Sequence, residues 1–153
     1  MTTQIRNIGS LIAVCRAAAN IAATAGGSGD DTEVTGVILD RGANGFPQSA
    51  VLAVPYTATL AAGETLSIAY AVQSGSEDDL SGATELTSAT AAVVATGPSG
   101  GGTVTGTFEV DLSLAGAGRY VRADITPDLS ASATDTAELS AVIVFGGADR
   151  LPV

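Results

Sequence analysis

The sequence has no lysine, no histidine and no tryptophan, and it has one cysteine, Cys15, among 153 residues. Histidine is the commonest general base, so its absence excludes Ser-His-Asp and Cys-His arrangements and most transition-metal sites. The absence of lysine excludes Schiff-base and P-loop chemistry. A lone cysteine permits no internal disulfide, and we interpret it as a small buried thiol. We therefore expect no catalytic residues, no cofactor and no metal site, and a protein that is not an enzyme.

Positive charge is also scarce, because six arginines stand against 16 acidic residues, for a net charge of −10. Nucleic-acid binding needs clustered positive charge to neutralise phosphates, so we expect no nucleic-acid partner. The apolar run at residues 11–14 is too short to span a bilayer, and Arg16 interrupts it as a signal peptide. We expect no membrane partner.

Acidic residues form two clusters, at residues 30–33 and 77–79, each in a loop rich in serine and glycine. Calcium takes six to eight oxygen ligands, but neither cluster has the spacing of a calcium loop. We interpret both as solvated loops and leave calcium binding open. A carboxylate pair for glycoside hydrolysis is not supported, because the chain lacks the aromatic platform that binds a sugar.

Nineteen glycines and the many Ser and Thr residues favour short strands separated by turns. Strand-like patterns occupy residues 34–40, 50–57, 65–73, 103–114, 118–126 and 137–145. The segment 85–96 is either a strand or a poorly patterned helix, and Val93 and Val94 favour a strand. This pattern predicts an all-β fold, a single-domain β-sandwich of jelly-roll type. Pro55 predicts an edge strand or a bulge. Val142 and Val144 make the last strand apolar on both faces, which indicates a central strand or a strand covered by a partner.

Residues 1–30 allow two interpretations. A helix capped by Ser10 would run to Ala25, whereas the alternative is an extended arm followed by an irregular strand. We favour the arm. The predicted organisation is an N-terminal arm at residues 1–30, then a sandwich domain at residues 31–153 with a short C-terminal tail at 146–153.

The segment 118–127 reads as a strand with a polar face. The candidate functional residues on and beside this face are Arg119, Tyr120, Arg122 and Asp124. One hypothesis is structural: Arg122 pairs with a carboxylate on a neighbouring strand, either Glu109 or Asp111. The other is an intersubunit contact, because Tyr and Arg are enriched where interfaces carry their binding energy. The sequence leaves both open.

Four ordered pieces resemble small structural proteins encoded beside the capsid genes of tailed bacteriophages. They are Ile38-Leu39-Asp40-Arg41 with Gly45-Phe46 and Ser49-Ala50, the acidic Ser76-Glu77-Asp78-Asp79, Arg119-Tyr120-Val121-Arg122 with Ile125-Thr126, and the segment 141–153 ending Arg150-Leu151-Pro152-Val153. Asp149 departs from the pattern, which often has a basic residue there. The first thirty residues match nothing.

The resemblance implies a virion protein of the capsid cement or decoration class. Such a subunit would form a homotrimer, bind the major capsid protein and bridge its neighbours on the outer surface of the head. The expected interface residues are Arg119, Tyr120, Arg122, Asp124, Arg150, Leu151, Pro152 and Val153. Two alternatives remain, a tail or head–tail connection protein and a carbohydrate-binding β-sandwich.

Overall fold

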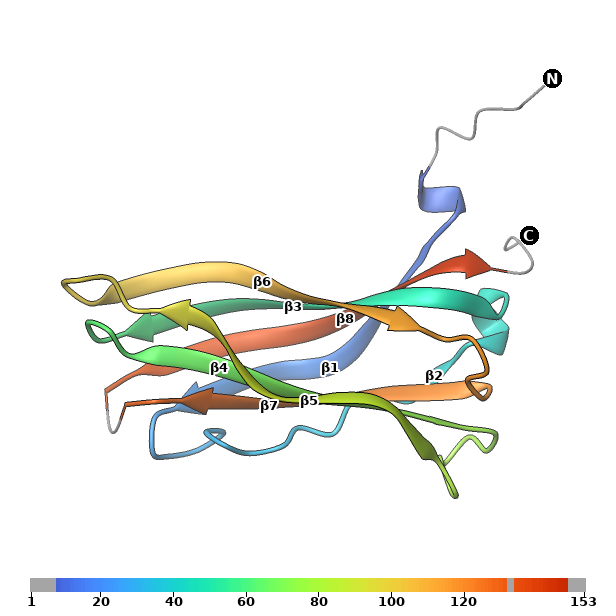
Figure 1. Cartoon of the computed structure of the whole chain (residues 1–153), viewed down its shortest axis with the longest axis horizontal. Helices are drawn as coiled ribbons and strands as arrows, with labels where there is room; N and C mark the ends of the chain where they lie inside the picture. The colour runs from blue at the N-terminus through green and yellow to red at the C-terminus, as the bar shows by residue number, and fades with distance from the viewer. Residues whose placement is uncertain (1–7, 132–133, 149–153) are drawn as a thin grey trace.

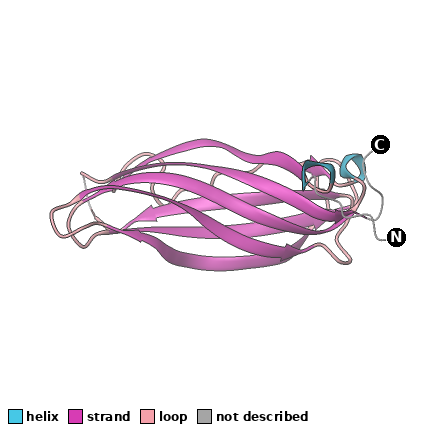
Figure 2. Cartoon of the chain, turned by 90° about the horizontal axis from the view of Figure 1, so that it is seen from above, coloured by secondary structure: helices cyan, strands magenta, loops and turns pink. Residues whose placement is uncertain are grey.

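A computed structural model describes residues 8–131 and 134–148 and shows two β-sheets packed face to face (Figures 1 and 2). The elements in chain order are the 3-10 helix η1 (Ile8–Ser10), β1 (Ala13–Thr24), β2 (Leu39–Asp40), the 3-10 helix η2 (Gly42–Asn44), β3 (Pro47–Leu60), β4 (Thr65–Gly75), β5 (Thr84–Thr96), β6 (Gly102–Ser113), β7 (Tyr120–Leu129) and β8 (Thr136–Ala148). The β3–β4 and β5–β6 connections lie at one end of the sandwich in Figure 1. Helix η1 and the end of β8 lie at the other end, which we call the terminal end.

The two sheets each contain four antiparallel strands. One has the order β1-β8-β3-β6 and the other β2-β7-β4-β5. Apart from β4 and β5, which pair with each other, strands that follow one another lie in different sheets, so most pairing joins segments far apart in the sequence. The predicted all-β, jelly-roll-like sandwich is confirmed.

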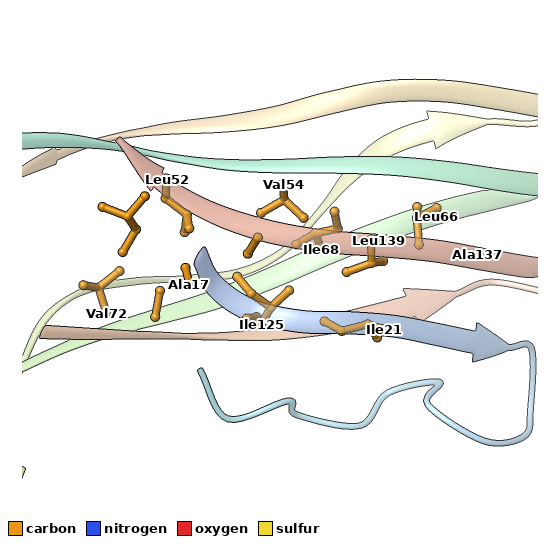
Figure 3. Packing of buried hydrophobic residues seen from close by; sticks show 14 of the residues in the cluster. Ala17, Ile21, Leu52, Val54, Leu66, Ile68, Val72, Ile125, Ala137 and Leu139 are labelled. Carbon is orange, nitrogen blue, oxygen red and sulfur yellow. The ribbon is translucent and has the colours of Figure 1, made fainter. Parts of the chain in front are cut away.

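The core lies between the sheets and is built from aliphatic residues of alternating strand positions (Figure 3). Leu52 and Val54 of β3 point into this layer from one sheet, and Leu66 and Ile68 of β4 point into it from the other; all four are 0% exposed. Small residues such as Ala17 fill the space beside β1. Burying these aliphatic side chains supplies about 25 cal/mol for each Å² of apolar surface removed from water, so the core dominates the stability of the fold.

Residues 13–24 form a strand, so the helix interpretation from Ser10 to Ala25 is wrong for this segment. The segment is extended, as the arm interpretation expected, but β1 pairs with β8 at the edge of its sheet and therefore belongs to the sandwich. Its pairing shifts register twice, between Arg16 and Ala18 and between Ala18 and Ile21. Pairing with β8 and burial of Ile21 override the helix preference of the alanines. The sandwich begins at Ala13 rather than at residue 31.

The segment 34–40 was predicted as one strand, yet only β2 (Leu39–Asp40) is a strand and Val34 makes a single bridge to Ile125. Gly36 donates its backbone N–H to Asp124 Oδ1 at 2.8 Å instead of to a strand neighbour. The next N–H, that of Val37, donates to the Ala17 carbonyl of β1 at 2.6 Å. The segment therefore links β7 of one sheet to β1, an edge strand of the other.

Pro55 does not lie on an edge strand, because β3 runs between β6 and β8. Its pairing with β6 is continuous, whereas the pairs with β8 pass from Ala53↔Val142 to Tyr56↔Leu139. Proline has no N–H to donate, so the ladder is interrupted on the β8 side only and the register does not change. A shallow hollow of about 410 Å³ opens on the outer face at this level.

Strand β8 lies between β1 and β3, so it is central, as one interpretation of its two apolar faces predicted. It extends to Ala148, which pairs with Pro47. The expected tail at 146–153 therefore begins later, since residues 146–148 still belong to the strand. Residues 149–153 lie outside the described part of the chain.

Candidate interaction surfaces

The polar face of β7 is built around an ion pair between Arg122 and Asp124. Arg122 Nε lies 3.0 Å from Asp124 Oδ1, and its Nη2 donates to Gln73 Oε1 on β4 at 3.0 Å. The hypothesis that Arg122 pairs with Glu109 or Asp111 is wrong, because those residues belong to β6 of the other sheet. Asp124 is only 2% exposed and also accepts the backbone N–H of residue 36. This pair ties β7 to β4 and to the segment before β2.

Arg119 and Tyr120 present a more accessible surface at the terminal end. Arg119 donates from Nε and Nη2 to the two carboxylate oxygens of Asp40, at 2.9 and 2.8 Å, and its guanidinium lies 5.2 Å from the centre of the Tyr120 ring. The Arg119 side chain is 53% exposed. An ion pair this open to water adds little to stability, so its surface remains available for a contact.

The Asp40 carboxylate gives a pH-dependent prediction. Hydrogen bonds from Arg119 hold the pKa of Asp40 below its ordinary value. The stabilisation from Asp40 is then complete above its unfolded pKa of about 3.9 and is lost as the pH falls through the lower folded value. An NMR titration should place the Asp40 midpoint below about 3.9, and Arg119→Gln should move it back up. An Asp40 midpoint that Arg119→Gln leaves unchanged would contradict the geometry.

Arg41 has a structural role that the sequence reasoning missed. Its side chain is 3% exposed and donates to four backbone carbonyls, those of Pro47 (2.7 Å), Leu114 (3.1 Å), Ala117 (2.5 Å) and Gly118 (2.7 Å). The backbone N–H of Arg41 also donates to the Arg119 carbonyl at 2.8 Å. The fork of guanidinium donors lets one side chain join several chain segments. Arg41 therefore fixes the turn after β2 against the turn before β7.

The acidic loop at residues 76–79 lies against the same end. The Gly118 N–H donates to Ser74 Oγ at 2.6 Å, and a Cβ at Gly118 would lie 2.4 Å from the Gly75 carbonyl oxygen. Within the loop, the Ser81 N–H donates to Asp79 Oδ1 at 2.7 Å and lowers the pKa of that carboxyl. Three of the four sequence pieces that carry the bacteriophage resemblance thus meet at the terminal end.

In the acidic cluster at residues 30–33, the Asp30 carboxylate is hydrogen-bonded to backbone N–H groups. Asp30 accepts the N–H groups of Gly26 and Leu129, at 2.7 and 2.8 Å. Among residues 8–131 and 134–148, no group of three or more acidic, cysteine or histidine side chains is placed to hold a metal ion. In the same ranges, no helix is long and apolar enough to cross a membrane.

Cys15, interpreted as a small buried thiol, is only partly buried on β1. That burial raises the pKa of the thiol, while a weak contact from Sγ to Asn44 Oδ1 at 4.0 Å acts in the opposite direction. The raised pKa keeps the group protonated and unreactive near neutral pH.

An apolar surface covers part of the outer face of the β1-β8-β3-β6 sheet, near the terminal end. We call it the valine patch, and its residues are Ile12, Val14, Val51, Ala53, Val142 and Val144. In one row across the sheet, Val14 pairs with Val144 and Val144 with Val51. In the next row, Val142 lies beside Ala53. Val14 is 63% exposed, so apolar side chains face solvent where an antiparallel sheet normally presents polar ones.

Charged residues border the valine patch on both sides. On β6, Asp111 pairs with Val51 and Glu109 with Ala53. On β1, Arg16 pairs with Val142, and its guanidinium donates to the Ala18 carbonyl and to Asn20 Oδ1. An apolar centre with a charged rim is the usual composition of a protein-binding surface.

Of the predicted interface residues, the described structure places four on or beside the first half of β7. Arg119 is exposed, Tyr120 and Arg122 are partly exposed, and Asp124 is buried. Arg150, Leu151, Pro152 and Val153 lie outside the described residues. The valine patch was foreseen only at Val142 and Val144. Its other members could have been found only from the pairing of β8 with β1 and β3.

No protein-family model matches the sequence, and no curated protein matches it. Solved structures do resemble the fold. The crystal structure of the T13 viral particle of infectious bursal disease virus aligns with a TM-score of 0.51 at 13% identity, covering 92% of this chain and 32% of that one. The VP2 subviral particle of the same virus aligns with a TM-score of 0.48 at 13% identity, over 90% of this chain and 33% of that one. This chain spans about a third of the length of those proteins. The likeness to the T13 particle protein concerns the fold alone.

Proposed function

We propose that this protein is a virion structural protein, a cement or decoration subunit that binds the outside of a bacteriophage head and bridges neighbouring major capsid proteins. The observation that carries the proposal is the valine patch. A sheet that already buries one face in the core exposes an apolar surface on the other, and such surfaces mark sites of protein association.

Two further observations support a virion role over other kinds of association. The sandwich shares its fold with a protein whose structure was determined in a viral particle, that of infectious bursal disease virus. The sequence pieces that resemble bacteriophage head proteins are also placed together, through the hydrogen bonds of Arg41 and the ion pair of Asp40 with Arg119. We therefore assign the terminal end to contact with the head.

The proposed mechanism is mechanical. Several subunits, associated as a homotrimer, hold adjacent capsid proteins together and oppose the pressure of the packaged DNA. Each contact is modest, and simultaneous contacts on several neighbours multiply the overall affinity. Arg119 is the most accessible of the described interface residues and Tyr120 lies beside it, whereas Arg122 and Asp124 pair with each other and hold the sandwich together. The net charge of −10 keeps the subunit soluble until it binds.

Binding to heads tests this function. Purified protein should co-sediment with expanded heads assembled without it and should not bind heads already saturated with it. Raising the salt concentration should weaken binding through the exposed guanidinium of Arg119. Arg119→Gln should reduce that salt dependence, and Arg16→Gln, which removes an exposed arginine from β1, is the matched control. Protein that stays in the supernatant at low salt would overturn the proposal.

A further inference from the structure

We propose that the valine patch of one copy receives residues 150–153 of a second copy, with Arg150 paired to Asp111 and the apolar residues after it lying over the valines. This inference deepens the proposed function, because it names how subunits associate with one another before or during binding to the head. It concerns self-association in solution, so it can be tested without heads.

The receiving site is a hollow at the terminal end of the patch. It has a volume of about 280 Å³ and is lined by Ile12, Ser49, Ala50, Val51, Asp111, Leu112, Val144, Phe145 and Gly146. A hollow of this volume is large enough to receive a side chain of a peptide segment. Its lining is mainly apolar, and Asp111 is its one charged residue.

Charge identifies the occupant. Asp111 and Glu109 form no ion pair with any residue of the described ranges. The chain contains six arginines and no lysine or histidine. Four of the arginines are held within the described structure, and they are Arg16, Arg41, Arg119 and Arg122. Arg16 is exposed but donates to the Ala18 carbonyl and to Asn20, so we consider the two remaining arginines, Arg6 and Arg150, as partners of Asp111.

The neighbouring residues favour Arg150 over Arg6. Arg150 is followed by Leu151, Pro152 and Val153, which supply apolar side chains for an apolar surface. Proline restricts the backbone to extended conformations, so ordering this segment on a surface loses less entropy than ordering an ordinary peptide. Arg6 lies in a more polar sequence, between Ile5 and Asn7. The segment after β8 therefore matches both the charge and the apolar character of the hollow.

Geometry favours a second copy over the chain's own segment. Asp111 lies two strands from β8, and Ala148 lies four residues beyond the row that contains Val144. With about 4.8 Å between strands and about 3.4 Å per residue, the backbone separation is about 17 Å. A return onto the same face also takes a four-residue turn, which would hold Arg150 at the end of the sandwich. A segment from another copy has no such constraint.

Exchange of this kind would also produce a closed oligomer. Each copy would give its 150–153 segment to the next copy and receive one in its own hollow, which is a head-to-tail contact between two different surfaces. Such contacts generate a ring when the rotation between copies closes. The proposed homotrimer is one ring of this type.

A charge exchange tests the inference with the full-length protein. We expect the wild type to self-associate in sedimentation equilibrium, and Asp111→Arg or Arg150→Asp alone to weaken the association by about tenfold or more, because each places like charges together. Combining Asp111→Arg with Arg150→Asp should restore association, since the pair is reformed with its charges exchanged. Glu138→Arg is the matched control, because Glu138 is exposed on the same face outside the hollow. It should leave association unchanged.

A second variant tests the apolar half of the contact. Val144→Asp places a charge in the patch on the outer face of the sheet, so it should abolish association while circular dichroism and the melting temperature stay close to those of the wild type. A wild-type protein that is monomeric at every concentration would overturn the inference, as would a double variant that fails to regain association. If heads still bind a monomeric protein, the proposed function stands and only the exchange of segments is lost.

Discussion

Replacing Arg41 with alanine is expected to lower the free energy of unfolding by about 3–5 kcal/mol, measured by urea denaturation. The guanidinium is buried and donates to carbonyls of residues 47, 114, 117 and 118. Its removal takes this donor from all four acceptors, of which the Leu114 carbonyl still accepts the Ala117 N–H. Each lost bond to a charged donor costs about 1.5–3 kcal/mol before relaxation. A domain of this size has a total stability of about 5–15 kcal/mol, so the variant should be severely destabilised.

Two further substitutions sharpen the test of Arg41. Arg41→Lys keeps the positive charge but replaces the planar guanidinium with a single ammonium nitrogen. It should therefore lower the free energy of unfolding less than Arg41→Ala does, but still leave it below that of the wild type. Arg119→Ala removes an exposed arginine at the same end of the sandwich, and its effect should be much smaller. If Arg41→Ala changed the unfolding free energy no more than Arg119→Ala, the buried guanidinium would not be what joins the two turns.

Replacing Gly36 with alanine is expected to lower the free energy of unfolding by about 1–3 kcal/mol, also in urea denaturation. A Cβ at this position would lie 2.0 Å from the Ala123 carbonyl oxygen and 2.8 Å from that of Ala17. Both oxygens are backbone atoms of paired strands, so neither can move aside without disturbing its ladder. The displacement would also stretch the bond from the Gly36 N–H to Asp124.

Gly100→Ala is the control for Gly36. A Cβ at Gly100 meets no heavy atom within 4 Å, so this substitution should leave stability unchanged or raise it slightly. Equal changes in unfolding free energy for Gly36→Ala and Gly100→Ala would show that Gly36 is not packed closely between the backbones of β7 and β1.

Most strands from β3 to β8 could be predicted because their burial pattern follows the period-two alternation of apolar residues, whereas β5 is mostly exposed and has no such alternation. In β6, Val104, Phe108 and Val110 turn inward while the threonines between them face out. Strand β1 was harder to predict, since its sequence Ala13–Thr24 is rich in alanine and fits a helix equally well. Its conformation depends on pairing with β8, more than a hundred residues away, and local pattern contains no information about that pairing.

The candidate surfaces show the same limit. Alternation correctly placed Arg122 and Asp124 on the polar face of β7, but not their pairing with each other, because the sheet that contains Glu109 could not be known. Arg41 belongs to the first of the sequence pieces that resemble bacteriophage proteins. Its burial, however, depends on carbonyls of a turn some seventy residues later in the chain. The valine patch arises from three strands of different parts of the sequence, so its extent follows from register alone.

The central claim is attachment to the outside of a virus head, and image reconstruction of heads assembled with and without this protein tests it most directly. The account predicts additional density on the outer surface, at positions of three-fold symmetry, into which three copies of the sandwich fit with their terminal ends toward the shell. Identical reconstructions, or additional density only in a ring on the tail axis, would contradict it.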